Sequence, residues 1–169
     1  KGINHENKTI ATTALSSRYV KPTHLDDALN SEDSELRFDA AAHEKITKSQ
    51  LHHALTDDDV DVRLSAINNE RIKPEHIDRA LKDGNPIIRS NAAKHFNITS
   101  EQLHTALSDT DETVKQKAVT NIKITPEHID RVLKGNFTIR AQKDAVRHFN
   151  ANKGNYNTAL ESQHPEVRQ

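Results

Sequence analysis

The segment Ile72–Asn97 reads IKPEHIDRALKDGNPIIRSNAAKHFN, and the segment Ile124–Asn150 reads ITPEHIDRVLKGNFTIRAQKDAVRHFN. Both contain the string PEHIDR, both continue to a leucine and a lysine, and both end in His-Phe-Asn. Near-copies that begin 52 residues apart are typical of a repeat protein. In such a protein the fold is decided by the repeating unit and by how the units stack.

The two copies belong to a longer series, because an apolar residue recurs every 26 residues and a leucine follows it nine positions later. The apolar series is Val20, Ile46, Ile72, Ile98 and Ile124, and the leucines are Leu29, Leu55, Leu81, Leu107 and Leu133. We predict that both series form the core.

The period predicts one domain over residues 1–169. It consists of a partial repeat 1–19, repeats starting at 20, 46, 72, 98 and 124, and a partial repeat 151–169. Ile3 and Ile10 fit the back half of the first partial repeat. Because the pattern is cut at both ends and begins at Lys1, we expect a piece of a longer array.

Each unit predicts two short helices. Thr125 is suited to cap a first helix and Pro126 to its first turn. The expected caps of the second helices are Asp59, Asn85 and Asp111, with Pro86 and Pro165 in first turns. Helices of roughly 8–10 residues are unstable alone in water, so stacking must stabilise them. We therefore predict an all-α fold, a right-handed α-solenoid of about six stacked two-helix repeats.

Composition narrows the function classes. The 24 basic and 25 acidic residues give a net charge of −1, which removes the simplest indication of a nucleic-acid partner. The chain has no cysteine, so we expect no disulfide, no thiolate metal site and a cytoplasmic location. No apolar run is long enough to cross a membrane, and no pattern indicates a small-molecule substrate.

The segment Ala54–Leu81, ALTDDDVDVRLSAINNERIKPEHIDRAL, resembles the leucine-rich repeat variant family, a relative of HEAT-type repeats. The shared features are a Leu-x-Asp start, a Val-Arg pair, an alanine, an asparagine and a proline before the next leucine. The units are longer than the family pattern and lack its Asn-Pro pair, since Asn69 precedes Glu70. Similar repeats occur in uncharacterised tailed-phage proteins. The resemblance implies a scaffold, and the iron–sulfur members of the family use cysteines that this chain lacks.

Neighbouring repeats alternate, which accounts for most of the 11 histidines. The fifth position of the unit reads His24, Gln50, His76, Gln102 and His128, and a position near its end reads His43, Asn69, His95, Asn121 and His148. Thr47 with Gln50, and Thr99 with Gln102, match the capping box. We interpret the alternation as two ways of starting a helix, in which units with proline do not need the glutamine.

A second alternating row reads Asp26, His52, Asp78, His104 and Asp130. It offers two neighbouring ligands at each step rather than the closed set of about four that zinc prefers. We therefore interpret it as a structural row in preference to a metal site, and we expect no cofactor. Protonation of histidines near pH ~6.5 remains an alternative role.

One cation recurs in each unit, at Arg37, Arg63, Arg89, Lys115, Arg140 and Arg168. Such a column would suit a phosphate backbone. In the resembling families this arginine pairs with the aspartate-containing turn of a neighbouring repeat. We therefore expect pairs with a row that reads Asp33, Asp59, Asn85 and Asp111.

The eighth position varies in charge while its neighbours are fixed. Such variation suits partner recognition, and neutral drift is the alternative explanation. The candidate binding residues are Asp27, His53, Arg79 and Arg131 from this row, with Lys82 and Lys134 beside it. No phosphate-binding loop or hydrolase motif appears. A glycosylase on HEAT-like repeats would need an asymmetric acidic residue in a basic cleft, and none is evident. We predict a non-catalytic scaffold that binds a protein partner; the alternative is a nucleic-acid-binding HEAT-like repeat protein.

Overall fold

A computed structural model describes residues 12, 13, 15, 17 and 19–168. Ile3 and Ile10, and with them most of the partial repeat 1–19, lie outside the described residues. The chain forms two compact units, Lys1–Ala80 and Leu81–Gln169, which are treated separately below. Every regular element in the described residues of both units is an α-helix.

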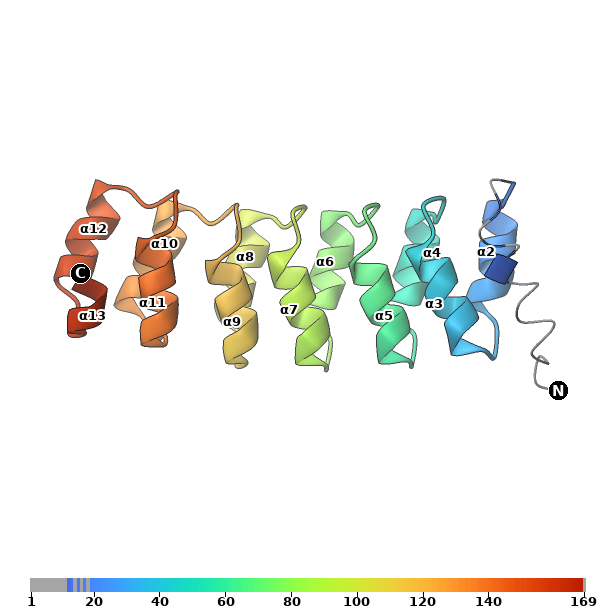
Figure 1. Ribbon diagram of the computed structural model, residues 1–169, viewed down its shortest axis with the longest axis horizontal. Coiled ribbons are helices and arrows are strands. Elements are labelled where there is room, and N and C mark those ends of the chain that lie inside the picture. Colours follow the sequence, from blue (N-terminus) through green and yellow to red (C-terminus); the bar gives the residue numbers. More distant parts are fainter. Residues whose placement is uncertain (1–11, 14, 16, 18, 169) are drawn as a thin grey trace. The chain divides into compact units, whose positions relative to one another are not determined.

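The first unit consists of helix pairs whose members alternate between two layers (Figure 1). The first helices of its repeats pack through α2 against α4, and the second helices through α3 against α5. Its helices are α2 (Pro22–Leu29), α3 (Ser34–Ala42), α4 (Lys48–Ala54), α5 (Val60–Ile67) and α6 (Pro74–Ala80).

The second unit repeats this arrangement. Helix α9 packs between α7 and α11 in one layer, and α10 packs against α12 in the other. Its helices are α7 (Pro86–Lys94), α8 (Ser100–Ala106), α9 (Glu112–Val119), α10 (Pro126–Lys134), α11 (Ile139–Val146), α12 (Lys153–Leu160) and α13 (Pro165–Arg168). The repeated helix pairs are the building blocks of a helical-repeat solenoid, as predicted. The right-handed sense, the single continuous domain and its repeat bounds stay predictions.

The two predicted apolar series lie in the core. All ten of their members are buried, with relative exposures of 8% or less. Alanines fill the gaps between them, among them Ala66, Ala92 and Ala118, which are fully buried on the second helices. Small side chains let neighbouring helix pairs approach closely, so a chain with few large apolar residues still buries a continuous core.

The helices begin where the sequence predicts. The carboxylate of Asp59 accepts a hydrogen bond from the backbone N–H of Asp61, and the Asn85 side chain accepts one from Ile87. Asp111 caps α9 in the same way, and Thr125 caps α10. Each cap satisfies backbone N–H donors that the first turn of a helix cannot satisfy itself. Asp59, Asn85 and Asp111 therefore define the start of second helices, and Thr125 defines the start of a first helix.

Candidate interaction surfaces

The alternating histidines and glutamines both accept a backbone hydrogen bond at the start of the first helices. Gln50 Oε1 accepts a hydrogen bond from the Thr47 N–H at 2.9 Å, and His76 Nδ1 accepts one from the Lys73 N–H at 3.0 Å. The predicted capping boxes at Gln50 and Gln102 are therefore confirmed. The units with proline do without the glutamine, as predicted, because an imidazole nitrogen of His76 or His128 replaces the amide oxygen as the acceptor.

The far end of each of these side chains reaches the preceding repeat. Gln50 Nε2 donates to the Pro22 carbonyl at 2.8 Å, and His128 Nε2 lies 3.1 Å from the Ser100 carbonyl oxygen. His76 Nε2 lies 3.2 Å from the Lys48 carbonyl oxygen. Since Nδ1 of each histidine accepts a backbone hydrogen, Nε2 must carry the ring proton and donate it to that carbonyl. Histidine and glutamine are thus equivalent links, each with one acceptor and one donor.

The asparagines near the end of the unit form a second link between repeats. Asn121 Nδ2 donates to the Ala93 and His95 carbonyls at 2.9 and 3.4 Å, and its Oδ1 accepts from the Lys123 N–H at 2.9 Å. Asn69 makes the equivalent bonds in the first unit. In the alternate repeats His43, His95 and His148 accept the same local backbone hydrogen through Nδ1. Within each unit, the asparagine therefore bonds the turn that ends its own repeat to the turn that ends the preceding repeat.

The arginine row joins repeats as well, but with other partners than expected. Arg37 forms a two-armed ion pair with Asp57, at 2.8 and 3.0 Å, and Arg89 forms the same pair with Asp109. The expected partners Asp59 and Asp111 use their carboxylates to cap their own helices instead. The partner is the aspartate two residues earlier, whose carboxylate also accepts the backbone N–H of the capping aspartate.

Each pair is also tied to the backbone. Arg89 Nη1 donates to the Asp83 and Gly84 carbonyls at 2.9 and 3.2 Å. Burial opposes ionisation of Asp109, but hydrogen bonds from Arg89 and from the Asp111 N–H outweigh it and lower the pKa of the Asp109 carboxyl. Arg37 and Arg89 of the cation column are therefore engaged within the scaffold.

Replacing Arg89 with alanine is expected to lower the free energy of unfolding by about 2 kcal/mol, because it removes charged hydrogen bonds from a carboxylate that is only 10% exposed. Arg140 is the matched control. It holds the same position in its repeat, but its side chain is 82% exposed and lies 3.9 Å from Asp144. Arg140→Ala should change the free energy by less than about 0.5 kcal/mol. Urea denaturation of both variants measures the difference, and equal costs would contradict an internal role for the row.

The predicted binding residues divide between the two units. In the first unit Asp27, His53 and Arg79 are exposed on α2, α4 and α6, one on each first helix. In the second unit Lys82 is exposed, while Lys134 lies 3.5 Å from Asp130. Arg131 is half-buried and donates to His104 Nδ1 and to Ser108 Oγ, both at 2.7 Å. Asp27, His53 and Arg79 thus form an open row, whereas Arg131 is engaged by its own scaffold.

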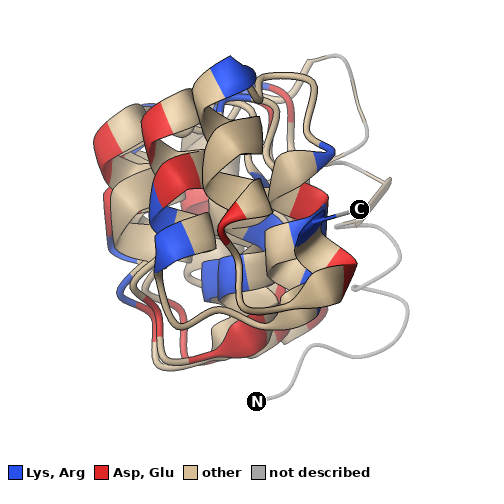
Figure 2. Ribbon diagram, turned by 90° about the vertical axis from the view of Figure 1, so that its left-hand side faces the viewer, with Lys and Arg blue, Asp and Glu red and all other residues tan. Residues whose placement is uncertain are grey.

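Charge is mixed along the helices rather than separated by sign. Figure 2 shows basic and acidic residues next to one another on the same helices. Within the described residues no group of three histidine, aspartate or glutamate side chains is placed to hold a metal ion. The described residues also contain no helix long and apolar enough to cross a bilayer.

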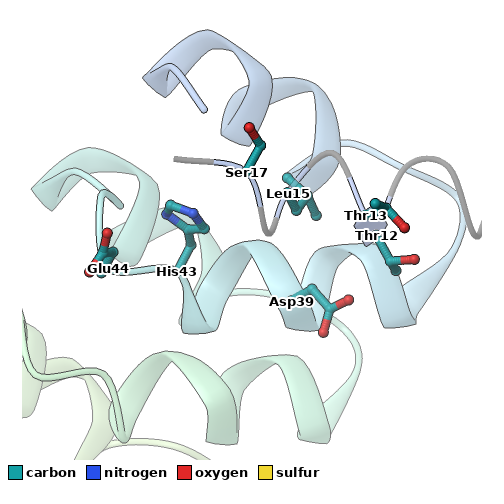
Figure 3. A pocket seen from close by; sticks show the side chains of 7 residues that line it. All are labelled: Thr12, Thr13, Leu15, Ser17, Asp39, His43 and Glu44. Atoms are coloured by element: carbon teal, nitrogen blue, oxygen red, sulfur yellow. The ribbon is translucent and has the colours of Figure 1, made fainter. Parts of the chain in front are cut away.

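Two clefts mark the first unit. One of about 530 Å³ is lined by hydroxyls and by Asp39, His43 and Glu44 (Figure 3). His43 Nδ1 is already bonded to the Lys45 N–H at 3.0 Å, so it is not available there as a base. The other, of about 350 Å³, is polar and includes His53 together with Arg37 and Asp57.

Sequence reasoning missed an exposed apolar series in the second unit. It consists of Phe96, Ile122 and Phe149, which are 52%, 61% and 75% exposed. Each follows the His or Asn that links the turns, so all three lie on turns joined by the asparagine bonds described above. The signal was present in the sequence, because the phenylalanine of the shared His-Phe-Asn ending is apolar at a position where the earlier repeats carry Glu44 and Glu70.

The chain is similar to a leucine-rich repeat variant. That solved structure is described as "a leucine-rich repeat variant with a novel repetitive protein structural motif"; it shares 19% sequence identity over 96% of this chain and 80% of its own, with a TM-score of 0.49. No protein-family model and no curated protein matches the chain.

Proposed function

We propose that the chain is a non-catalytic scaffold that binds a protein partner through its helical-repeat surface. The observation that supports this proposal is that the recurring residues and the varying residues of the repeats occupy different environments. The recurring polar residues bond to their own or neighbouring repeats, as at Gln50, Asn121 and Arg89. The residues that differ from repeat to repeat are exposed, as at Asp27, His53 and Arg79. A rigid frame with a varied exposed surface suits recognition of a macromolecule.

Within this proposal the open row of Asp27, His53 and Arg79 is one contact surface, and Lys82, Arg131 and Lys134 are candidate contacts in the second unit. The engaged state of Arg131 makes it a weaker anchor, since a partner would have to replace its bonds to His104 and Ser108. We also propose that the scaffold acts in the cytoplasm and that its repeats are related to those of tailed-phage proteins.

Affinity capture from a lysate, with and without nuclease, tests the proposal. We expect discrete protein bands that survive nuclease treatment and an affinity that changes little with salt. Recovery of nucleic acid, with protein bands lost after nuclease, would overturn the proposal in favour of nucleic-acid binding. A steep fall of affinity as salt rises would point the same way, because phosphate contacts release counterions.

A further inference from the structure

We propose that the apolar row formed by Phe96, Ile122 and Phe149 in the second unit is a docking site for an extended, acidic peptide segment. This inference rests on the proposed function and names one surface and one class of partner for it. The row lies on the turns 94–97, 120–123 and 147–150, which end three successive repeats.

The three turns are held side by side by hydrogen bonds from asparagine side chains. Asn121 Nδ2 reaches the His95 carbonyl, and Asn150 Nδ2 reaches the Ile122 and Ile124 carbonyls at 3.1 and 2.8 Å. The row is therefore a fixed series with one apolar side chain per repeat. Helices that pack directly are roughly 8–10 Å apart, which sets the approximate spacing of the row.

Two of the three side chains are held in place. The Phe96 ring stacks on the His95 ring with centroids 4.7 Å apart, and the Phe149 ring stacks on His148 at 4.5 Å. Each phenylalanine buries one face on the scaffold and leaves more than half of its surface exposed. Rings that are ordered before binding lose little conformational freedom when a partner covers them.

The fold does not require apolar residues at these positions. The equivalent turns of the first unit carry Glu44 and Glu70, both exposed, and Asn69 makes there the same bonds that Asn121 makes in the second unit. Exposed aromatic and aliphatic side chains that contribute nothing evident to the frame indicate a contact surface.

Charge identifies the class of partner. The turns that carry the row also carry the exposed cations Lys94, Lys123 and Arg147, and they contain no carboxylate. A partner that places apolar side chains on the row and carboxylates on these cations is complementary in both respects. In an extended segment of polyproline II conformation every third residue lies on the same face and advances about 9 Å, close to the spacing of the row. The occupant is therefore an extended acidic segment with an apolar residue at every third position.

Fluorescence anisotropy with a labelled peptide of three tandem Glu-Asp-Leu units tests the proposal directly. We expect the full chain to bind it with a Kd on the order of 10–100 μM, as suits a small interface. The triple variant F96E/I122E/F149E should bind at least about tenfold more weakly. Because glutamate already occupies this position at Glu44 and Glu70, the variant is expected to fold, and circular dichroism checks that it does.

Two controls separate the row from general stickiness. Ile87 is 53% exposed at the opposite end of α7, so I87E should leave the affinity unchanged. A peptide of Lys-Arg-Leu units should bind at least about tenfold more weakly than the acidic one, because the cations of the row repel it. Equal binding of the two peptides, or an unchanged affinity in the triple variant, would overturn the proposal.

Failure here is distinguishable from failure of the proposed function. If the triple variant captures the same lysate proteins as the wild type, the row is not the docking site although the scaffold still binds a protein. If sedimentation shows that the wild type self-associates and the triple variant does not, the occupant is a second copy of the chain and the peptide assignment is wrong. If neither chain captures any protein, the proposed function itself fails.

Discussion

Substitution of both His76 and His128 by alanine is expected to lower the free energy of unfolding by about 2–6 kcal/mol, whereas substitution of both by glutamine should change it by less than about 1 kcal/mol. Each histidine is buried and joins a backbone N–H of its own repeat to a carbonyl of the preceding one. Alanine leaves both backbone groups without a partner, at a cost of about 1–3 kcal/mol per site. Glutamine restores both bonds, as Gln50 and Gln102 do.

The same two histidines make stability depend on pH. Burial lowers the pKa of His76 and of His128 below the value of 6.5 that histidine has in an unfolded chain. Between the lowered pKa and 6.5 the unfolded chain therefore binds more protons than the folded chain. Stability is fully present above about pH 6.5 and falls as the pH drops through this window. Protonation of Nδ1 also removes the acceptor that starts the helix.

Urea denaturation at neutral pH and at a series of lower pH values measures both effects. The H76Q/H128Q variant should lose less stability than the wild type as the pH falls below 6.5. Some acid sensitivity should remain, because burial also lowers the pKa of His95 and of His148. Identical pH profiles for the two chains would contradict the assignment of these histidines as neutral links.

Replacement of Asn121 by alanine is the second change with a large expected effect, a loss of about 2–4 kcal/mol. The side chain is 4% exposed and makes three hydrogen bonds, two of them to carbonyls of the preceding repeat. Two of the three backbone partners, the His95 carbonyl and the Lys123 N–H, lie in turns where water can only partly replace the amide of Asn121. Most of the cost of leaving these groups unsatisfied should therefore appear in the free energy of unfolding.

Asn150 provides the comparison for Asn121. It makes analogous bonds to the Ile122 and Ile124 carbonyls, but it is half-buried rather than buried. Asn150→Ala should therefore cost less, about 1 kcal/mol. Thermal or urea denaturation of the two variants gives the order, and a larger loss for Asn150→Ala would contradict the account of these turns as buried links.

The period of 26 residues predicted the helix pairs, their caps and the core, because apolar spacing and capping chemistry act within one repeat. Asp59 and Thr125 are examples, since the partners of their side chains lie within three residues. Resemblance to the leucine-rich repeat variants added the expectation of stacking, and the helix contacts within each unit agree with it.

Contacts between repeats were harder to predict. The partner of Arg89 was expected to be Asp111 and is Asp109, because the turn before α9 carries both aspartates and only the geometry decides which of them caps. The equivalence of histidine and glutamine was missed for a similar reason. It depends on both ends of the side chain, and only one end contacts residues nearby in the sequence.

The exposed apolar row was overlooked because the repeat pattern drew attention to positions that are fixed. Phe96, Ile122 and Phe149 stand where the earlier repeats carry glutamate. The position is therefore not part of the repeating apolar pattern from which the core was predicted. Only the bonds between turns show that these three side chains belong to successive, connected turns. In our proposal, variation within a fixed frame distinguishes contact residues from structural ones.

The central claim is that recurring residues hold the frame and that exposed, varying residues bind the partner. Affinity capture with three baits tests it most directly: the wild type, H76Q/H128Q, and a variant with alanine at Asp27, His53 and Arg79 together with F96E/I122E/F149E. We predict that the first two baits recover the same protein bands and that the third, folded by circular dichroism, recovers none of them. Loss of the bands from H76Q/H128Q, or their retention by the third bait, would contradict the claim.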